Sequence, residues 1–333
     1  MSDVRSVPTL EDVARVAGVS RATVSRVVNG ATIVAPETTK MVQAAITELG
    51  YQPNRAARAL VTRRTGVIAV VVPETDDRVF TDPYFPQAYH GALQGFGRVD
   101  MHVVLAMAEP GAKSAKMVRY LESGHVDGAI IVSHHGPELG LLLERSWLPV
   151  VFVGDPEAPG IPYVDLDNRS AGRMATEHLI ERGCRRIGHI SGPLEMDSGH
   201  KRLMGFEDAM AAAGLDASLR AEGEYTSSSG RVVLDLLERC PDMDGLFVAN
   251  DLMAATAVAA IQESGRRVPE DIRVIGFDNS VAALQPTPQL TTMVNAADVS
   301  ARIAADMLIE ILGGGRPQSP VVLHSRLVQR GST

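Results

Sequence analysis

The chain has 333 residues, 45% of them hydrophobic, and a formal net charge of −8 at pH 7. No apolar run approaches the roughly 20 residues that span a membrane, and two cysteines are too few for a disulfide framework, so both of those protein classes are excluded. Residues 1–5 contain no apolar signal segment, so we expect a cytoplasmic protein. The length suffices for a small domain followed by two units with ordinary hydrophobic cores.

Residues 9–50 have the apolar periodicity of three short helices. In the first helix, Leu10, Val13 and Ala17 recur at the three- and four-residue spacing of a single face. Gly18 then favours a helix end, since glycine accepts the left-handed backbone conformation found there. A tight turn between two short helices is typical of a helix-turn-helix.

The second helix, residues 21–28, has two chemically different faces. Ser20 precedes it and is a suitable N-cap, because its hydroxyl can accept a hydrogen bond from an amide of the first turn. Val24, Val27 and Val28 lie together and can pack inward. The opposite face carries Arg21, Ala22, Ser25 and Arg26. A recognition helix needs this division because it enters the DNA major groove with its base-reading side chains outward.

Two arginines of the outward face are the candidates for reading bases. Arg21 and Arg26 can each present two parallel donors to guanine, a contact worth about 1–3 kcal/mol of discrimination. Hydroxyl and amide side chains nearby suit phosphate oxygens, namely Thr9, Thr23, Ser25 and Asn29. Phosphate contacts set the register on DNA without reading its sequence. The alternative is that these residues form an ordinary solvated helix face.

Charge is distributed unevenly along the chain. The first 65 residues hold nine Lys or Arg against five Asp or Glu, so the remaining residues carry a net charge of −12. A basic end attracts phosphate and gives salt-sensitive affinity, while an acidic remainder discourages non-specific adhesion to DNA. The acidic average of the chain is therefore compatible with DNA binding.

Several segments of this region resemble the head of the LacI/GalR family of transcriptional regulators, namely residues 9–14, 18–20, 23–29 and 50–57. The resemblance implies that Leu60, in a short helix that begins at residue 53, is a wedge for the DNA minor groove. It completes the expected DNA-binding set with Leu10, Ser20, Ala22, Asn54 and Ala57. So short a helix is unstable alone, so we expect it to fold on DNA, where Leu60 would partly unstack a base step. The alternative is a linker helix that only spaces two domains.

After residue 65, short β-branched runs alternate with Ala- and Leu-rich helical stretches, which is typical of parallel sheets covered by helices. The expected strands are residues 67–73, 102–107, 128–132, 150–153, 186–190, 245–249 and 274–277. Segments of the first half recur in the same order in the second, with 63–68 similar to 184–188, 126–129 to 243–246, and 151–155 to 274–278. The recurrence indicates two similar α/β units, joined near residues 165–168 and 289–295.

By the same family resemblance, the fold class is an all-α helix-turn-helix head plus an α/β part. Its two doubly wound parallel-sheet subdomains are expected to form a periplasmic-binding-protein-like clamshell. The expected domains are 1–52 for the DNA-binding head, 53–65 for the hinge helix and linker, and 66–333 for effector binding and dimerisation. Within the last domain, the N-subdomain comprises 66–165 plus about 296–319, and the C-subdomain comprises 166–290 plus about 320–330.

Ligands of such sheets bind beyond the carboxyl ends of the strands. Polar or aromatic residues, which suit a sugar, follow the expected strands there. They are Glu74, Tyr84, Phe85, Ser133, His134, Asp155, Asn250 and Asp278. Arg202 resembles the family's effector-binding arginine, and by the same resemblance Asn250 and Asp278 bind effector from the second unit.

Alternatives remain open for these cleft residues. The family often has two acids at its last motif, whereas Asn279 follows Asp278 here, which puts a second acidic contact in doubt. Helix capping or an ion pair at the hinge is the alternative for Arg202, Asn250 and Asp278. Core packing is the alternative for the two aromatic residues, Tyr84 and Phe85.

Three functional classes compete. The first is a homodimeric transcriptional repressor of carbohydrate-utilisation genes, which leaves a palindromic double-stranded DNA operator when a small sugar effector binds. Residues 54–65 and 191–193 resemble actinobacterial repressors of cellobiose and other β-glucoside uptake. An oligosaccharide or β-glucoside is therefore expected ahead of another monosaccharide, and a nucleobase-like corepressor comes third.

The second class is a sugar-binding protein without a regulatory role, and the third is an enzyme of carbohydrate metabolism. The sequence contains no Gly-x-Ser-x-Gly elbow, no P-loop and no complete set of metal ligands, so no catalytic residue is expected. We likewise expect no cofactor, no metal and no membrane partner.

Overall fold

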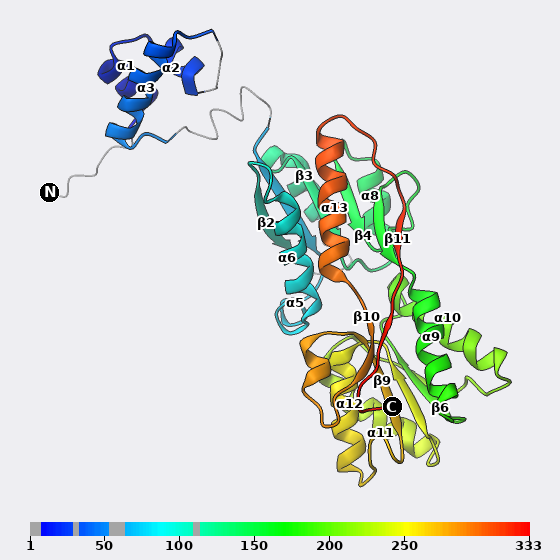
Figure 1. Cartoon of the computed structure of the whole chain (residues 1–333). Coiled ribbons are helices and arrows are strands. Elements are labelled where there is room, and N and C mark those ends of the chain that lie inside the picture. The colour runs from blue at the N-terminus through cyan, green and yellow to red at the C-terminus, as the bar shows by residue number, and fades with distance from the viewer. Residues whose placement is uncertain (1–7, 29–32, 53–63, 109–113) are drawn as a thin grey trace. The chain divides into compact units, whose positions relative to one another are not determined.

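The computed structural model describes residues 8–28, 33–52, 64–108 and 114–333. The chain divides into two compact units, Met1–Thr65 and Gly66–Thr333. The first unit is helical, and the second combines sheets with covering helices (Figure 1). Within the described ranges, every helix is too short or too polar to cross a membrane.

The first unit, called the head below, contains helices α1 (Leu10–Ala17), α2 (Arg21–Val28) and α3 (Pro36–Leu49). Thr9 begins α1 because its hydroxyl accepts a hydrogen bond from the Asp12 amide, while the Asp12 carboxylate accepts one from the Thr9 amide. Gly18 ends α1 in a left-handed conformation, with φ at 65°. The buried faces of the helices form one core from Val13, Ala17, Val24, Val42, Ala45 and Tyr51. The two-faced second helix predicted over 21–28 is confirmed.

One half of the second unit, the first lobe, is built on a parallel sheet with the strand order β11-β5-β4-β3-β1-β2. Its strands are β1 (Val67–Val72), β2 (His102–Met107), β3 (Gly128–Val132), β4 (Val150–Val153), β5 (Tyr163–Leu166) and β11 (Val321–Leu323). Its helices are α5 (Asp76–Thr81), α6 (Tyr84–Phe96), α7 (Ser114–Tyr120), α8 (Glu138–Glu144) and α13 (Ala297–Leu312), with a π-helical turn η1 (Leu121–His125).

Helices cover both faces of this sheet. In β1, Ile68 and Val70 pack into the cluster that includes α6 and α13 residues, whereas Ala69 and Val71 pack into the cluster that includes α7 and α8 residues. Alternate side chains of a strand point to opposite faces, so a strand covered on both sides is apolar throughout. The continuous run of valine, isoleucine and alanine in β1 follows from that position.

The other half, the second lobe, has the strand order β12-β10-β9-β8-β6-β7. Its strands are β6 (Ile187–Ser191), β7 (Arg220–Glu222), β8 (Gly245–Val248), β9 (Arg273–Asp278), β10 (Thr291–Val294) and β12 (Leu327–Val328). Its helices are α9 (Asn168–Glu181), α10 (Asp197–Ala212), α11 (Gly230–Arg239) and α12 (Asp251–Glu263), with the 3-10 turns η2 (Ser227–Ser229) and η3 (Val281–Leu284). β12 pairs antiparallel with β10, so this sheet is parallel except at that edge.

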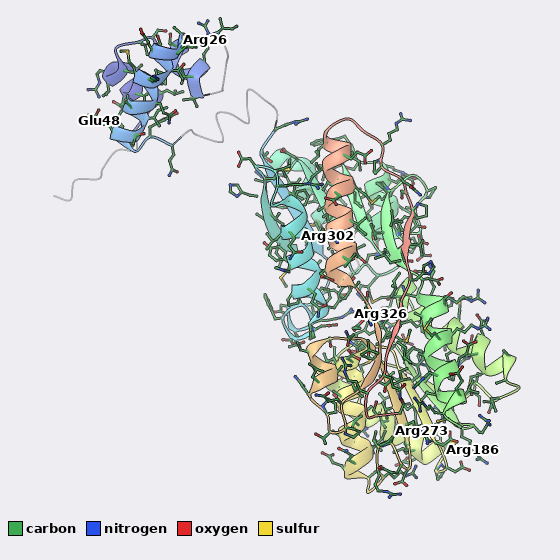
Figure 2. All side chains as sticks on the ribbon, viewed as in Figure 1. Arg26, Glu48, Arg186, Arg273, Arg302 and Arg326 are labelled. Atoms are coloured by element: carbon green, nitrogen blue, oxygen red, sulfur yellow. The ribbon has the colours of Figure 1, made fainter. Side chains whose placement is uncertain are left out.

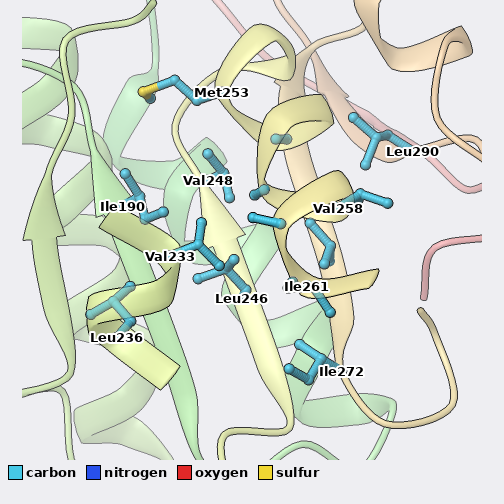
Figure 3. Close-up of a cluster of buried hydrophobic side chains, with 14 of the residues drawn as sticks. Ile190, Val233, Leu236, Leu246, Val248, Met253, Val258, Ile261, Ile272 and Leu290 are labelled. Carbon is cyan, nitrogen blue, oxygen red and sulfur yellow. The ribbon is translucent and has the colours of Figure 1, made fainter. Parts of the chain in front are cut away.

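The core on one face of the second sheet is drawn in Figure 3. Val233 of α11, Leu246 of β8 and Val258 of α12 meet there, and all three are fully buried. The opposite face of the sheet packs against α9 and α10 through a separate cluster that contains Phe206 and Phe247. The second lobe is therefore also covered on both faces.

The chain passes between the lobes after β5, after β10 and after β11. The crossing segments are hydrogen-bonded, since the Asp167 amide donates to the Leu323 carbonyl at 2.8 Å and the Val294 amide donates to the Arg326 carbonyl at 2.9 Å. Figure 2 labels Arg326 on the last of these segments. The chain returns to the second lobe a few residues later than the expected position at about residue 320, because β11 pairs with β5 in the first sheet before the chain crosses to β12.

Candidate functional site

The outward face of α2 is open to solvent. Arg21, Ala22 and Arg26 are exposed, and Ser25 is half-buried; Arg26 is labelled in Figure 2. The Nε atom of Arg21 forms an ion pair with Glu11 of α1 at 3.0 Å. An exposed pair of this kind contributes at most about 1 kcal/mol, so a phosphate or a base can compete for the guanidinium. This face can therefore change partners when DNA is present.

The hydroxyl side chains of the head already have structural roles. Ser20 Oγ accepts a hydrogen bond from the Thr23 amide at 3.2 Å, which confirms Ser20 as the cap of α2. Thr9 Oγ1 donates to Asp12 at 2.8 Å. Leu10 is half-buried and packs against the head core, so it offers DNA only part of its side chain. Other predicted DNA-binding residues lie outside the described ranges, namely Asn29, Asn54, Ala57 and Leu60.

A cavity lies between the two lobes, at the carboxyl ends of strands from both sheets. The predicted effector residues that line it are Tyr84, Ser133, His134, Arg202, Asn250 and Asp278. Further side chains in its wall include Arg78, Asp82, Asp165, Asn168 and Tyr225. Parallel α/β sheets bind ligands at this edge, because the loops that follow the strands converge there.

Arg202, on α10, is a buried cation held at the cavity wall. Its Nε donates to Asn168 Oδ1 at 2.9 Å, and its Nη1 donates to the Ala249 carbonyl oxygen at 2.6 Å. Its guanidinium carbon lies 3.6 Å from the centroid of the Phe277 ring. A Cβ atom at Gly172 of α9 would stand 2.4 Å from the Arg202 carbonyl oxygen, so glycine is needed for the close approach of α9 to α10. The backbone and side chain of Arg202 are thus both fixed.

Asn250 caps α12 at the cavity wall. Its Oδ1 accepts a hydrogen bond from the Met253 amide at 2.9 Å, and its Nδ2 donates to the Tyr225 carbonyl oxygen at 3.2 Å. Helix capping, the alternative role given for Asn250, is therefore correct for its Oδ1 atom. Because an amide nitrogen carries two hydrogens, Asn250 keeps one donor for a ligand.

Asp278 ends β9 and lines the cavity, whereas Asn279 does not. Asp278 Oδ1 accepts a hydrogen bond from Asn295 at 3.0 Å. Burial raises the pKa of Asp278 well above its ordinary value, and the Arg202 charge opposes this shift. Asn279 Oδ1 accepts instead from Arg330 at 2.6 Å, so this position supplies no second acidic contact to the cavity.

The first lobe contributes Ser133 and His134, which follow β3. Ser133 Oγ donates to Glu74 Oε1 at 2.7 Å. His134 Nε2 lies 2.7 Å from the Asp155 carbonyl oxygen, and its ring meets the edge of Phe152 with the ring centroids 5.3 Å apart. Burial lowers the pKa of His134, so its imidazole is neutral at pH 7. A neutral imidazole that donates to a carbonyl keeps its other nitrogen as an acceptor.

Three residues of the predicted cleft set do not line the cavity, namely Glu74, Phe85 and Asp155. Phe85 is buried in the core of the first lobe, so the core-packing alternative is correct for it. Asp155 follows β4 as expected, but the chain turns at Gly154, where φ is 105°. The Asp155 carboxylate instead pairs with Lys201 of the second lobe at 3.5 Å. Lys201 also contacts Asp165 at 3.4 Å, so this lysine links the two lobes beside the cavity.

The sequence interpretation missed several lining residues for different reasons. Tyr225 lies in the loop after β7, so the rule on carboxyl ends applies to it, but residues 220–222 were not among the expected strands. Arg78 lies on the short helix α5 and Asp82 directly follows it, in a stretch whose composition resembles a solvated loop. Nothing local in that stretch indicates that α5 lies against the other lobe.

The electrostatics of the cavity favour an uncharged, polyhydroxylated ligand. Burial raises the pKa values of Asp82 and Asp165, the latter to about 6. An anionic ligand would add a further charge beside these carboxyl groups, whereas hydroxyl groups both donate and accept. The Tyr225 ring lies 5.0 Å from the guanidinium carbon of Arg78 and 5.8 Å from that of Arg202. Among the described side chains, no group of three or more His, Cys, Asp or Glu could hold a metal ion.

Comparison with known proteins places the chain in a family. Residues 9–54 match the model of bacterial regulatory proteins of the lacI family, and residues 176–333 match a periplasmic binding protein-like domain. The HTH-type transcriptional regulator CelR of Thermobifida fusca is 41% identical, over 98% of this chain and 99% of that protein.

Solved structures agree with these matches. A transcriptional regulator CelR-cellobiose complex is 38% identical and covers 98% of this chain and 100% of its own, with a TM-score of 0.75. The lac repressor dimer bound to operator and the anti-inducer ONPF is 29% identical and covers 98% of this chain and 99% of its own, with a TM-score of 0.89. The chain belongs to the lacI family of bacterial regulatory proteins.

Proposed function

We propose that the chain is a homodimeric repressor of carbohydrate-utilisation genes, released from a near-palindromic operator by a neutral saccharide of the cellobiose class. The observation that carries the proposal is the union of a basic helix-turn-helix head with a cavity between two lobes, in which Arg202, Asp278 and Tyr225 converge. The cellobiose complex of a 38% identical regulator supports this class of ligand. The operator-bound dimer of the lac repressor supports DNA as the partner and a homodimer as the assembly.

The cavity has the donors, acceptors and ring that a saccharide needs. A guanidinium and an amide can donate to hydroxyl oxygens, a carboxyl oxygen can accept from hydroxyl hydrogens, and a tyrosine ring can cover the apolar face of a pyranose. Tyr84 and Tyr225 are the tyrosines of the wall, where Arg, Asp, Asn and Ser side chains are more numerous. That composition favours a saccharide over a nucleobase-like corepressor.

The DNA-binding role divides among the head residues by their chemistry. Arg21 and Arg26 read base edges, and the hydroxyls of Thr9, Ser20, Thr23 and Ser25 contact phosphate oxygens. We further propose that residues 53–65 act as hinge and linker, with Leu60 as the minor-groove wedge. The protein acts in the cytoplasm, where operator DNA is located, and binds its sugar without chemical turnover.

Ligand binding requires the lobes to change their separation. The cavity measures about 80 Å³, whereas small-molecule pockets measure about 300–1,000 Å³. A disaccharide therefore fits only if the lobes move apart around it. Because the chain passes between the lobes through several segments, their movement can alter the segment that leads to the head. The ligand shifts the protein between conformations that differ in operator affinity.

Isothermal titration calorimetry on the full chain tests this ligand class. Cellobiose, glucose, glucose 6-phosphate and guanine are titrated separately, and cellobiose is expected to bind most tightly. Binding of guanine or of the phosphorylated sugar in preference to cellobiose would show that the ligand class is wrong. Selection of duplexes from a randomised DNA pool, followed by fluorescence anisotropy, tests the operator. No enrichment of a palindrome over scrambled DNA would contradict the repressor assignment.

A further inference from the structure

Arg78, which no motif of the sequence indicates, is a buried cation in the wall of the cavity. It lies on α5 in the first lobe and is 7% exposed. Its Nη1 donates to Glu74 Oε1 at 2.5 Å. A buried charge is tolerated only when it is paired and its hydrogen-bonding groups are satisfied. The pairing with Glu74 meets the first requirement.

The second requirement is not met by the protein itself. Among the described residues, the buried side-chain nitrogens without a hydrogen-bond partner are Arg78 Nε and His189 Nε2. His189 is stacked between Phe206 and Phe247 and does not line the cavity, so its unpaired atom lies within the core of the second lobe. Arg78, in contrast, does line the cavity. A bound molecule that reaches Nε when the lobes separate can therefore supply the acceptor that this atom lacks.

The contacts of Arg78 cross from the first lobe to the second. Its Nη1 lies 3.6 Å from the sulfur of Met196, and its guanidinium carbon lies 5.0 Å from the centroid of the Tyr225 ring. On its own lobe, the guanidinium carbon lies 5.6 Å from the Phe85 ring centroid. Aromatic rings on both lobes thus flank the guanidinium, as in cation–π contacts.

A network of hydrogen bonds holds the partner of Arg78 in place. Glu74 accepts from Ser133 at 2.7 Å and from His135 Nε2 at 2.9 Å, in addition to Arg78. The other ring nitrogen of His135 lies 3.2 Å from Glu195 of the second lobe. Burial alone would lower the pKa of His135, but the hydrogen bond and the charge of Glu74 outweigh it and raise that pKa. Glu74 is therefore a carboxylate fixed by several donors, and it fixes Arg78 in turn.

We propose that Arg78 is a specificity-determining residue. Its guanidinium donates a hydrogen bond to one hydroxyl oxygen of the saccharide, and Arg202 contacts the same saccharide. The inference rests on the proposed function and deepens it. A neutral hydroxyl oxygen is sufficient as the acceptor, because the Glu74 carboxylate already balances the Arg78 charge. The saccharide is thus held by one arginine from each lobe, and both guanidinium groups lie near the Tyr225 ring. Glu74 is the positioning residue for Arg78.

The test pairs a protein variant with ligands that each lack one hydroxyl. Cellobiose and its monodeoxy analogues are titrated calorimetrically into the wild type, Arg78→Met and Lys201→Met. In the wild type, we expect the analogue that lacks the hydroxyl bound by Arg78 to bind roughly 10- to 100-fold more weakly, the usual loss for a hydrogen bond to a charged group. In Arg78→Met, that analogue and cellobiose are expected to bind equally, since the partner of the missing hydroxyl is already absent.

Lys201→Met is the matched control because it removes another cation beside the cavity, one whose contacts are with Asp155, Asp165 and Asp197. It is expected to keep the wild-type ranking of the analogues. Arg78→Met leaves Glu74 without its arginine, so the double variant Glu74→Gln/Arg78→Met is measured alongside it, because loss of both charges leaves no unpaired buried carboxylate. Circular dichroism and operator binding establish that each variant is folded.

The outcomes separate the inference from the proposed function. If the wild type binds no cellobiose, both are overturned. If the wild type binds cellobiose and both Arg78 variants rank the analogues as the wild type does, the role of Arg78 is overturned and the proposed function stands. If Arg78→Met instead binds cellobiose and every analogue more weakly by the same factor, so that no analogue comes to match cellobiose in affinity, Arg78 supports the fold of the cleft and does not recognise a hydroxyl.

Discussion

The head and the cavity prepare their binding groups in opposite ways. In the head, the predicted DNA-contacting side chains are exposed or half-buried, and their hydroxyl hydrogen bonds join residues three positions apart, as between Ser20 and Thr23. In the cavity, the groups are buried and their partners are distant, as between Arg202 and Asn168 or between Ser133 and Glu74. The contacts of the head are local and near solvent, so DNA can compete for these groups, whereas the cavity side chains are held by distant parts of the chain before the ligand arrives. Damage to the cavity should therefore have larger effects on binding than damage to one contact of the head.

The largest expected effect is at Arg202. Arg202→Met removes a buried guanidinium and its charge-assisted hydrogen bonds, so cellobiose affinity should fall at least about 100-fold, or about 3 kcal/mol. Calorimetry measures this loss, and fluorescence anisotropy should show unchanged operator affinity without sugar. Arg173→Met is the control, because Arg173 is an exposed arginine of α9 paired only with Glu177 in the same helix. Comparable losses of cellobiose affinity in Arg202→Met and Arg173→Met would contradict the expected difference between buried and exposed arginines.

Asp165 should make the unfolding free energy of the Gly66–Thr333 unit depend on pH. Burial raises its pKa from the ordinary 3.8 to about 6, so the folded state holds a proton that the unfolded state releases between these values. Stability is therefore expected to fall as pH rises from 4 to 6, by about 2–3 kcal/mol for a shift of this size. Asp165→Asn has no proton to lose at this position and should reduce the decline, measured by urea unfolding of the Gly66–Thr333 unit.

The matched control for Asp165 is Asp208→Asn. Asp208 is exposed, and its hydrogen bond with Arg169 lowers its pKa, so it cannot cause a loss of stability as pH rises. This variant should keep the decline. A decline of equal size in Asp165→Asn and in the wild type would be incompatible with the assigned burial of Asp165.

The head core offers a test of its independence from the cavity. Val24→Ala removes a fully buried side chain of α2, which should destabilise the head by about 2 kcal/mol. Operator affinity should fall while cellobiose affinity stays unchanged. Val16→Ala in α1, where the side chain is 40% exposed, is expected to leave both affinities near the wild type. A loss of cellobiose binding in Val24→Ala would mean that the two functions are not separable.

How far the sequence could predict each region follows from the same contrast. The bounds of α2, the cap at Ser20 and the inward valines depend on residues close together in the chain, so local periodicity is sufficient. The cavity draws on residues more than 200 positions apart, and the rule on strand ends indicates some of them, while the family resemblance indicates Arg202. The rule on strand ends finds Asn250 and Asp278, but it cannot predict whether a side chain in the turn after a strand points into the cavity or away from it.

The errors in the cavity have identifiable causes. Asp155 follows its strand as expected, yet the turn at Gly154 leads its carboxylate to Lys201. Phe85 lies in the first turn of α6, whose buried face packs on the sheet, so it lies in the core while its neighbour Tyr84 lines the cavity. Arg78 could not be predicted because its burial depends on the Tyr225 and Met196 side chains of the other lobe.

The smallest expected effect concerns one base contact. Arg26→Ala removes an exposed guanidinium, and we expect about 1 kcal/mol of lost discrimination at one operator position, with weaker overall binding. Competition anisotropy with singly substituted operators measures this preference. Equal discrimination at every position in the variant and the wild type would remove Arg26 from the base-reading set, and would leave Arg21 as the remaining candidate on the outward face.

The central claim is that saccharide binding in the cavity controls the affinity of the head for operator DNA. Operator affinity is measured by anisotropy with and without saturating cellobiose, and cellobiose affinity is measured by calorimetry with and without operator, all on the same full-length protein. Linkage requires the two ratios to be equal, and a coupling of about 1–3 kcal/mol would make each roughly 5- to 150-fold. The account predicts equal ratios in this range, with cellobiose weakening operator binding. Operator affinity that is the same with and without bound cellobiose would contradict it.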